Sequence, residues 1–273
     1  MRWIIGDVHG MFGPLEALLE EVARRDAGAR FYFVGDYINR GPDSKRVLDL
    51  LISLKSVGAQ FVRGNHDDIF DQVINGQSYA TNAANSDPVV AFQWFMEHGL
   101  DATFESYGVD YAALEQCQLR PGVERLNKIT AAVPDSHKRF IRELGPLIEE
   151  ADLFVAHAIW DPYENDLSES MRRTLERDGG ARHKLLWGRF GEQDIAWTKM
   201  WKRTGYFGHT PVFAYAASQK TGELLPEPIV GNQLVLLDTA CALSDTGRLT
   251  AYCAEAKRFV QVDRFAKIVK PRS

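Results

Sequence analysis

The sequence predicts an α/β fold in which a mainly parallel sheet is followed by a helical insertion and then by a second sheet. Over roughly the first sixty residues, short apolar runs alternate with amphipathic helical patterns, as in successive strand–helix–strand units. Helical patterns then continue to about residue 148, and short strand-like segments dominate from residue 206 onward. Together these observations indicate one large α/β unit with an insertion.

The N-terminal part contains three expected strands and two expected helices. Residues 2–6, 31–35 and 59–63 are apolar runs of the length of buried strands. Between them, apolar residues recur at i, i+3, i+4 and i+7, which places them on one face of a helix. These residues are Leu15, Leu18, Leu19 and Val22 in the first interval, and Val47, Leu50, Leu51 and Leu54 in the second.

The rest of the chain is expected to supply the insertion and the second sheet. Residues 67–148 have helical character, interrupted by a Gly/Ser/Asn-rich loop at residues 76–86. Their apolar stripes, such as Phe92, Phe95 and Met96, are expected to pack rather than to bind a ligand. The expected later strands are residues 153–156, 213–216, 234–238, 249–253 and 259–262.

Composition restricts the class of protein. With 45% hydrophobic and 25% charged residues, the chain is typical of globular domains, and its 273 residues fit one domain. A net charge of −5 argues against binding of a nucleic acid, which would need a basic surface. The spacing of Cys117, Cys241 and Cys253 fits neither a disulfide framework nor a zinc knuckle. We also predict no contact with a membrane and a cytoplasmic location, because the sequence begins without an export leader and has no long apolar run.

Polar clusters follow each of the first three expected strands. Asp7 and His9 follow the first, Asp36 follows the second, and Asn65 and His66 follow the third. Because the carboxyl ends of parallel strands share one edge of a sheet, these side chains should converge. Carboxylates and imidazoles without opposing cationic side chains are satisfied by divalent cations, and these donors suit manganese, iron or zinc.

Two later histidines have the same relation to a strand. His157 and His209 each come directly after an apolar run, in the segments Phe-Val-Ala-His-Ala and Tyr-Phe-Gly-His-Thr-Pro. A single histidine at such a position is more often a structural residue, but in company with the three N-terminal clusters both become candidate metal ligands. His98, His137 and His183 match no motif and are expected to be exposed or structural.

Five motifs in order resemble the signature of the PPP-type metallophosphoesterases, and their bacterial serine/threonine phosphatase-like branch most of all. They are GDVHG (6–10), GDYINRG (35–41), GNHD (64–67), AHA (156–158) and GHT (208–210). The likeness spans most of the chain, and five ordered motifs are far more specific than any one of them. It implies a four-layer αββα sandwich with mixed sheets, in a single domain of residues 1–273 with a helical cap at about residues 68–148.

The resemblance also implies a centre of two divalent cations, manganese above all. The first cation would be held by Asp7, His9 and Asp36. The second would share Asp36, and its other ligands would be Asn65, His157 and His209. A bridging carboxylate fits the physics, because two cations ~3.5–4 Å apart need a shared anionic ligand. In the family, a hydroxide held between the metals attacks phosphorus in line.

The remaining family roles fall on the loops after the second and third strands. Arg40, Asn65 and Arg189 would bind phosphate, and His66 would protonate the leaving oxygen. Asn39 occupies the place where the protein phosphatases carry an Asp that keeps this imidazole protonated, and an amide supplies no such charge. We therefore expect a lower pH optimum, unless Asp67 or Asp68 faces His66 and compensates.

Three functions are open from the sequence. The leading one is a serine/threonine phosphoprotein phosphatase that hydrolyses phosphorylated proteins or small phosphoesters. The alternative is a diadenosine tetraphosphate hydrolase, since enzymes of that kind in the same superfamily also tend to lack the Asp replaced here by Asn39. A weakly active phospho-binding module is the third possibility.

Overall fold

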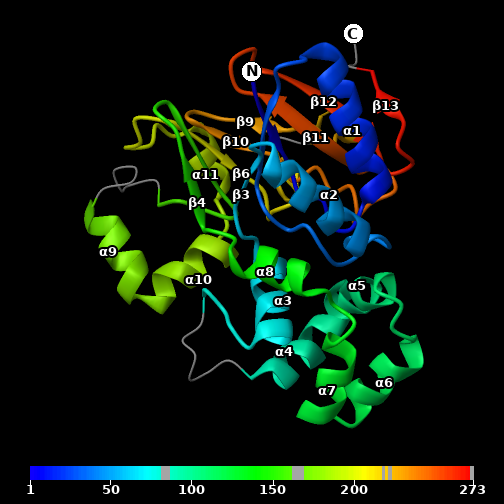
Figure 1. Cartoon of the computed structure of the whole chain (residues 1–273). Coiled ribbons are helices and arrows are strands. Elements are labelled where there is room, and N and C mark those ends of the chain that lie inside the picture. Colours follow the sequence, from blue (N-terminus) through cyan, green and yellow to red (C-terminus); the bar gives the residue numbers. More distant parts are fainter. Residues whose placement is uncertain (81–86, 162–168, 217–218, 221–222, 271–273) are drawn as a thin grey trace.

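The computed structural model describes residues 1–80, 87–161, 169–216, 219–220 and 223–270. It contains two large mixed sheets, helices on the outer faces of both, and a group of helices below the sheets in the view of Figure 1. Within the described ranges, no helix combines the length and apolar character needed to cross a bilayer.

The first sheet has six strands and joins the two ends of the chain. Its order is β13-β12-β11-β1-β2-β3. The three N-terminal strands run parallel, and β11 pairs with β1 in the antiparallel direction. The strands are β1 (Arg2–Ile5), β2 (Arg30–Phe33), β3 (Gln60–Phe61), β11 (Arg248–Cys253), β12 (Arg258–Asp263) and β13 (Ile268–Val269).

The second sheet has five strands in the order β4-β5-β6-β10-β9. Its three central strands are parallel to one another, and both edge strands are antiparallel to their neighbours. The strands are β4 (Leu147–Glu149), β5 (Leu153–Ala156), β6 (Thr204–Phe207), β9 (Ile229–Val230) and β10 (Leu234–Leu236). A separate hairpin consists of β7 (Gln219–Lys220) and β8 (Glu223–Leu224).

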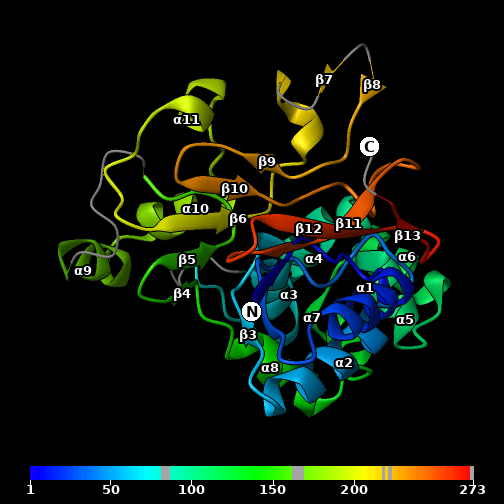
Figure 2. The same cartoon turned by 90° about the horizontal axis from the view of Figure 1, so that it is seen from above.

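The two sheets pack face to face, as Figure 2 shows from above. The core between them contains Ile4, Tyr32 and Val62 from the first sheet against Val155 and Val235 from the second. The outer face of the first sheet is covered by α1 (Phe12–Arg25) and α2 (Ser44–Ser56). The outer face of the second is covered by the segment with α9 (Glu169–Arg177), α10 (Gly179–Trp187) and α11 (Glu192–Ala196). The fold is therefore the expected αββα sandwich.

Helices α1 and α2 confirm the periodicity of the sequence. Leu15, Leu18 and Val22 of α1 are fully buried, as are Val47 and Leu51 of α2. Each helix thus turns one apolar stripe to the sheet. Burial of apolar surface is worth ~25 cal/mol per Å², so these stripes are a main source of helix stability.

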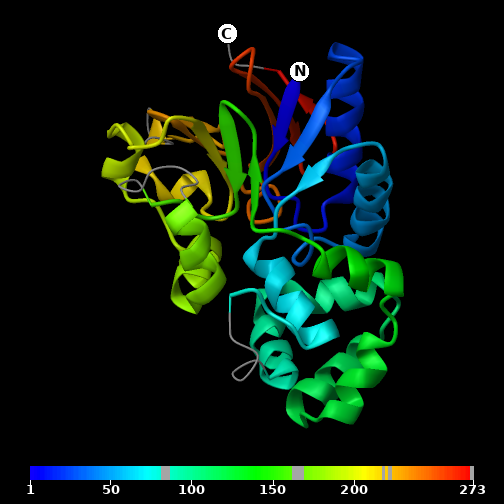
Figure 3. The ribbon, with the colours of Figure 1, turned by 60° about the vertical axis from the view of Figure 1, so that its left-hand side comes forward.

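The expected helical insertion lies between β3 and β4 and forms the lower group in Figures 1 and 3. Its elements are α3 (Asn65–Asn75), α4 (Pro88–Phe95), the π-helix η2 (Met96–Leu100), α5 (Asp101–Ser106), α6 (Tyr111–Leu119), α7 (Val123–Thr130) and α8 (Asp135–Arg142). Phe92, Phe95 and Phe104 are fully buried, which confirms that its apolar stripes pack. Part of the predicted loop, residues 81–86, lies outside the described residues.

Two expectations about strands are wrong. Residues 213–216 do not form a strand, because Pro211 begins a tight turn and the 3-10 helix η3 (Val212–Ala214) follows it. The strands at residues 249–253 and 259–262 exist, but they join the first sheet through the pairing of β11 with β1 instead of extending the second. This pairing makes the first sheet mixed, a feature that the N-terminal pattern alone did not reveal.

Candidate active site

The predicted metal ligands and His66 lie at the carboxyl ends of five parallel strands, three in the first sheet and two in the second. Asp7 and His9 follow β1, Asp36 follows β2, and Asn65 and His66 begin α3 after β3. In the second sheet, His157 follows β5 and His209 follows β6. Since the two sheets pack face to face, these ends meet at a shared edge.

Asp36 is at the centre of the cluster. Its Oδ1 lies 3.4 Å from Nε2 of His157, and its Oδ2 lies 3.5 Å from Nε2 of His9. Candidate ligand atoms form two groups, each within 4.8 Å: His9, Asp36 and His66 in one, and Asp36, His157 and His209 in the other. The carboxylate of Asp36 therefore belongs to both groups.

Asn65 joins the second group through its amide oxygen. Asn65 Oδ1 lies 2.8 Å from Nε2 of His157 and 2.9 Å from Nδ1 of His209. The other ring nitrogen of His157 lies 2.8 Å from the Val34 carbonyl, which fixes the orientation of the ring. The geometry thus brings together all four side chains predicted around the second cation.

Asp7 lies beside His209 and belongs to neither of these two groups. Its Oδ2 accepts a hydrogen bond of 2.9 Å from the backbone N–H of His209, while its Oδ1 is buried and makes no hydrogen bond within the described part of the chain. An unpaired buried carboxylate oxygen is costly unless a cation or another donor satisfies it. This free oxygen, together with the nitrogen and oxygen donors around Asp36, fits a site for divalent cations.

The pKa shifts of the clustered side chains are also consistent with a metal site. Burial lowers the pKa of His9 to about 3 and that of His209 to about 3. Burial and the nearby Asp238 carboxylate raise the pKa of Asp7 well above its usual range. Only the pair of Asp36 and His157 is held charged against burial, since Asp36 raises the pKa of His157 to about 9. The rings of His9 and His209 are thus neutral near pH 7, the form in which an imidazole binds a metal ion.

The backbone around the site is unusual. His9, Asp36, Asn39, Arg40 and His209 all have positive φ, between 45° and 71°, a region that residues other than glycine seldom adopt. Such strain gathers at functional sites, where the surrounding structure enforces it. The observation supports a shared functional purpose for these loops.

Two glycines let the backbone approach the buried carboxylates. A Cβ at Gly208 would collide with Oδ1 of Asp7, and a Cβ at Gly64 would collide with Oδ1 of Asp36. Any larger residue at either position would displace a candidate ligand.

Arg40 lies between two of the histidines. Its Nη1 is 2.5 Å from Nε2 of His9, and its Nη2 is 3.2 Å from Nε2 of His66. The insertion holds its backbone, because the N–H of Arg40 donates to the Gly99 carbonyl at 3.1 Å. Arg189 is exposed and donates to Thr210 Oγ1, directly after His209. Both guanidinium groups therefore border the cluster.

Asn39 contacts His66, as the motif comparison suggested. Its Nδ2 lies 2.9 Å from Nδ1 of His66, and its Oδ1 accepts a hydrogen bond of 2.7 Å from Thr103. Thr103 comes from helix α5 of the insertion and is fully buried. The insertion thus sets the orientation of the Asn39 amide.

The suggestion that Asp67 or Asp68 compensates for Asn39 is wrong. Asp67 accepts hydrogen bonds from the backbone N–H groups of Asp36, Tyr37 and Gly64 and so braces the loop that carries Asp36. Asp68 pairs with Arg63 at 3.0 Å. Neither carboxylate is directed at His66, because both are engaged elsewhere.

Sequence reasoning missed one buried carboxylate. Asp238 follows β10, the third parallel strand of the second sheet, and its side chain is 2% exposed. Its Oδ2 makes no hydrogen bond to any described residue, and its charge acts on Asp7. The rule that site residues follow parallel strands would have found it, had the direction of β10 been known.

Of the predicted structural histidines, His137 is confirmed as a buried one. It lies between the Tyr107 hydroxyl and the Asp49 carboxylate, at 2.7 and 2.9 Å. His183 is exposed, and His98 is partly buried.

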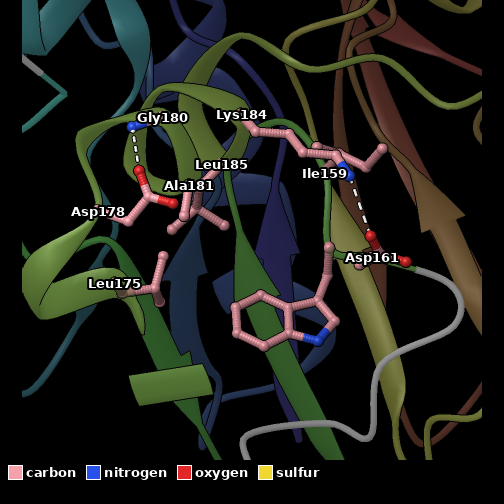
Figure 4. A pocket seen from close by; sticks show the side chains of 9 residues that line it. Ile159, Asp161, Leu175, Asp178, Gly180, Ala181, Lys184 and Leu185 are labelled. Atoms are coloured by element: carbon pink, nitrogen blue, oxygen red, sulfur yellow. Dashed lines mark hydrogen bonds and ion pairs between the residues drawn. The ribbon is translucent and has the colours of Figure 1, made fainter. Parts of the chain in front are cut away.

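A cavity of about 300 Å³ lies on the outer side of the second sheet, beside α10. Figure 4 shows its wall, where Leu175, Ala181 and Leu185 face the loop after β5 and where Lys184 pairs with Asp161 at 3.0 Å. None of the predicted site residues lines this cavity. It is therefore separate from the cluster around Asp36.

Fold and site together define a metallophosphoesterase. A family model of the calcineurin-like phosphoesterases matches residues 2–188, and the chain belongs to this family. Enzymes of this family use a dinuclear centre of divalent metals, for which the residues around Asp36 are candidate ligands. The resemblance and the enzyme class inferred from the sequence are thus confirmed.

Individual relatives carry more specific names. The symmetrical bis(5'-nucleosyl)-tetraphosphatase of Cellvibrio japonicus is 45% identical over 65 residues, 24% of either chain. The asymmetrical bis(5'-nucleosyl)-tetraphosphatase PrpE of Oceanobacillus iheyensis is 26% identical over 281 residues, covering 95% of this chain and 90% of that protein. The first match therefore spans about a quarter of its relative, and the second nearly all.

A solved structure agrees on the fold. The crystal structure of a protein provisionally classed as a diadenosine tetraphosphatase superimposes with a TM-score of 0.51 at 20% identity, over 96% of this chain and 92% of that one. The likeness extends across both sheets and the insertion, since it covers nearly the whole chain.

Proposed function

We propose that this metallophosphoesterase hydrolyses dinucleoside polyphosphates, such as diadenosine tetraphosphate, with the help of two divalent cations. The sequence motifs alone favoured a serine/threonine phosphoprotein phosphatase and left this activity as the alternative. The names of the relatives favour the alternative, above all PrpE, whose similarity spans 90% of its own length. The observation that carries the proposal is the contact of Asn39 with His66, considered with the leaving group that each substrate requires.

We assign the metal ligands as follows. Asp7, His9 and Asp36 hold the first cation; Asn65, His157 and His209 hold the second and share Asp36 with the first. The free Oδ1 of Asp7 and the convergence of two ring nitrogens on the oxygen of Asn65 support this division. Manganese is our first choice, with iron or zinc as alternatives, because carboxylate, amide and imidazole donors suit all three.

When bound, such a pair of cations lowers the pKa of a water between them and neutralises phosphoryl oxygens. The side chains of the protein bind and orient the substrate. Arg40, Arg189 and the amide of Asn65 hold the phosphate, and a planar guanidinium can do so through two parallel hydrogen bonds. The position of Arg40 between His9 and His66 supports this role.

His66 is the proposed proton donor to the leaving oxygen. Both ring nitrogens of His66 face N–H donors, Asn39 Nδ2 at Nδ1 and Arg40 Nη2 at Nε2, and neither donor supplies negative charge. A neutral imidazole is a weak acid compared with the imidazolium that a neighbouring Asp would maintain. His66 is thus a weak acid in this site, because neither partner would keep it protonated.

Such a weak acid suits an anhydride better than a phosphomonoester. Hydrolysis of a polyphosphate chain releases a nucleotide phosphate, which is a weak base and leaves with little help. Phosphoserine releases an alkoxide, which is strongly basic and needs a proton in the transition state. Asn39 therefore supports cleavage between phosphates.

We also propose that residues 1–273 act as one metallophosphoesterase domain, in which residues 68–148 serve as a cap. Hydrogen bonds from two residues of the insertion reach the site: Thr103 bonds to Asn39, and the Gly99 carbonyl accepts from Arg40. The cap would thus help to shape the site as well as cover it.

The test compares two substrates under the same conditions. Protein loaded with manganese is given diadenosine tetraphosphate and a phosphoserine peptide, and products are separated by chromatography. We expect kcat/KM to be at least about 10-fold higher for the dinucleotide. A preference for the peptide would restore the phosphatase, and turnover of neither would favour the phospho-binding module. The nucleotides released also tell symmetrical from asymmetrical cleavage.

A further inference from the structure

An aromatic cluster joins the insertion to helix α10 beside the candidate active site. It consists of Trp94 and Phe95 at the end of α4, His98 in η2, and His183 and Trp187 on α10. The two helices come from distant parts of the chain: α4 belongs to the insertion below the sheets (Figure 1), and α10 to the segment on the outer face of the second sheet. The cluster is therefore a bridge between the insertion and the helices on the second sheet.

Three of these rings form a nearly parallel stack. Trp94 and Trp187 have ring centroids 5.5 Å apart and an interplanar angle of 23°. His183 stacks on Trp187 at 5.9 Å and 13°. Trp94 is 49% exposed, although tryptophan is usually well buried. The stack therefore ends in a large flat ring that is open to solvent.

The cluster also contacts the catalytic histidines. Phe95 packs edge-on against His66 with centroids 5.0 Å apart, and Trp187 does the same against His209 at 6.2 Å. The Trp187 carbonyl lies 3.3 Å from Nε2 of His209. One end of the cluster thus borders the residues assigned to phosphate chemistry, and the other reaches the surface.

We propose that Trp94, whose exposed ring ends the stack on Trp187, is a stacking platform for a nucleobase of the substrate, and this inference rests on the proposed function. A nucleobase is a flat aromatic ring of suitable size to continue a parallel stack, and stacking on tryptophan is a common way to bind one. With the base on this platform, its polyphosphate chain extends toward Arg40 and Arg189. The platform would therefore select nucleotides among phosphoesters.

A peptide side chain is the competing occupant, and the geometry favours the base. The rings of Trp94, Trp187 and His183 are presented face to face, within 23° of parallel from one ring to the next. An aliphatic or phosphorylated side chain has no flat ring to stack on this arrangement, whereas a nucleobase can contact it with its whole face. The peptide nevertheless remains a distinct outcome of the test.

The first experiment measures steady-state kinetics with two substrates that share a phosphate chain. Trp94→Ala should raise KM for diadenosine tetraphosphate about 10-fold and leave KM for inorganic tetrapolyphosphate, which has no base, unchanged. Trp94→Phe should stay within about 3-fold of the unmodified protein, because a phenyl ring can still stack. Equal effects on both substrates, or none on either, would overturn the platform.

A matched control is Trp197→Ala. Trp197 is 54% exposed and lies at the end of α11, outside the aromatic cluster, so its removal should alter neither substrate's kinetics. Thermal melting of all variants shows whether any has lost its fold. A change in diadenosine tetraphosphate kinetics equal to that of Trp94→Ala would contradict the specific role of Trp94.

A binding measurement separates failure of this inference from failure of the proposed function. Isothermal titration of the manganese-loaded protein compares ADP with pyrophosphate, with no hydrolysis of dinucleotides required. We expect Trp94→Ala to weaken ADP binding about 10-fold and to spare pyrophosphate. If diadenosine tetraphosphate is not hydrolysed but this difference persists, only the proposed function fails. Weakened binding of a phosphoserine peptide with unaltered ADP binding would assign the surface to peptides and overturn the inference.

Discussion

The side-chain amide of Asn39 lies 2.9 Å from Nδ1 of His66. The phosphoprotein phosphatases that this chain resembles carry an aspartate at this position. Asn39 therefore contacts His66 without the negative charge of that aspartate. The consequence can be measured, because the two classes of substrate differ in how much they need a strong acid.

Asn39→Asp should therefore raise turnover selectively. A carboxylate beside His66 favours the imidazolium, so we expect kcat for a phosphoserine peptide to rise about 10-fold or more, with the ~10²–10⁴ that general acids contribute as the upper limit. For diadenosine tetraphosphate the change should stay below about 3-fold, because its leaving phosphate needs little protonation. Equal increases for both substrates, in parallel steady-state assays, would refute this account of Asn39.

Thr103→Val tests whether the insertion orients the Asn39 amide. The substitution keeps the shape of the side chain but removes the hydroxyl, which donates to Asn39 Oδ1 and accepts from the backbone N–H of Asn39. We expect kcat to fall about 10-fold with little change in KM, since each net hydrogen bond lost is worth ~0.5–1.5 kcal/mol. Thr130→Val is the control, since the Thr130 hydroxyl donates to the Asn127 carbonyl within the insertion and, among the described residues, has no other hydrogen-bond partner. A similar loss in both variants would indicate general destabilisation.

The stability of the cap region should depend on pH through His137. Burial lowers the pKa of His137 below its usual value, so the folded chain binds fewer protons than the unfolded chain as pH falls below about 6.5. Stability should therefore decline through that range on acidification and recover above it. Thermal melting at pH 5 and pH 8 measures the decline, and His137→Gln should make it smaller. An identical pH dependence in the variant would show that His137 does not contribute.

Much of the site could be predicted from sequence because of one simple rule. Asp7, Asp36 and Asn65 each follow a strand of a parallel sheet, and that topology alone brings their side chains to one edge. His157 and His209 obey the same rule in the second sheet. The convergence of these side chains could therefore be predicted from the order of strands in the sequence, without knowledge of the loop geometry.

Other features depend on contacts that no local pattern reveals. Asp238 was passed over because the short strand β10 gives no sign that it runs parallel to β6. The orientation of the Asp67 side chain could not be predicted, because backbone N–H groups compete with His66 as its partners. In the structure it accepts hydrogen bonds from the N–H groups of Asp36 and Tyr37. Trp94 and Trp187 have ordinary places on their own helices and meet only through the packing of the insertion. The C-terminal strands likewise reveal their sheet only through pairing with β1.

The shared position of Asp36 is the central claim, and the metal content of the purified protein tests it most directly. Elemental analysis after loading with manganese and desalting should give about two ions per chain. Asp36→Asn should lose both, because this carboxylate belongs to both groups of candidate ligands, whereas Asn65→Ala should lose about one. Two ions retained in Asp36→Asn, or no more than one in the unmodified protein, would contradict the account.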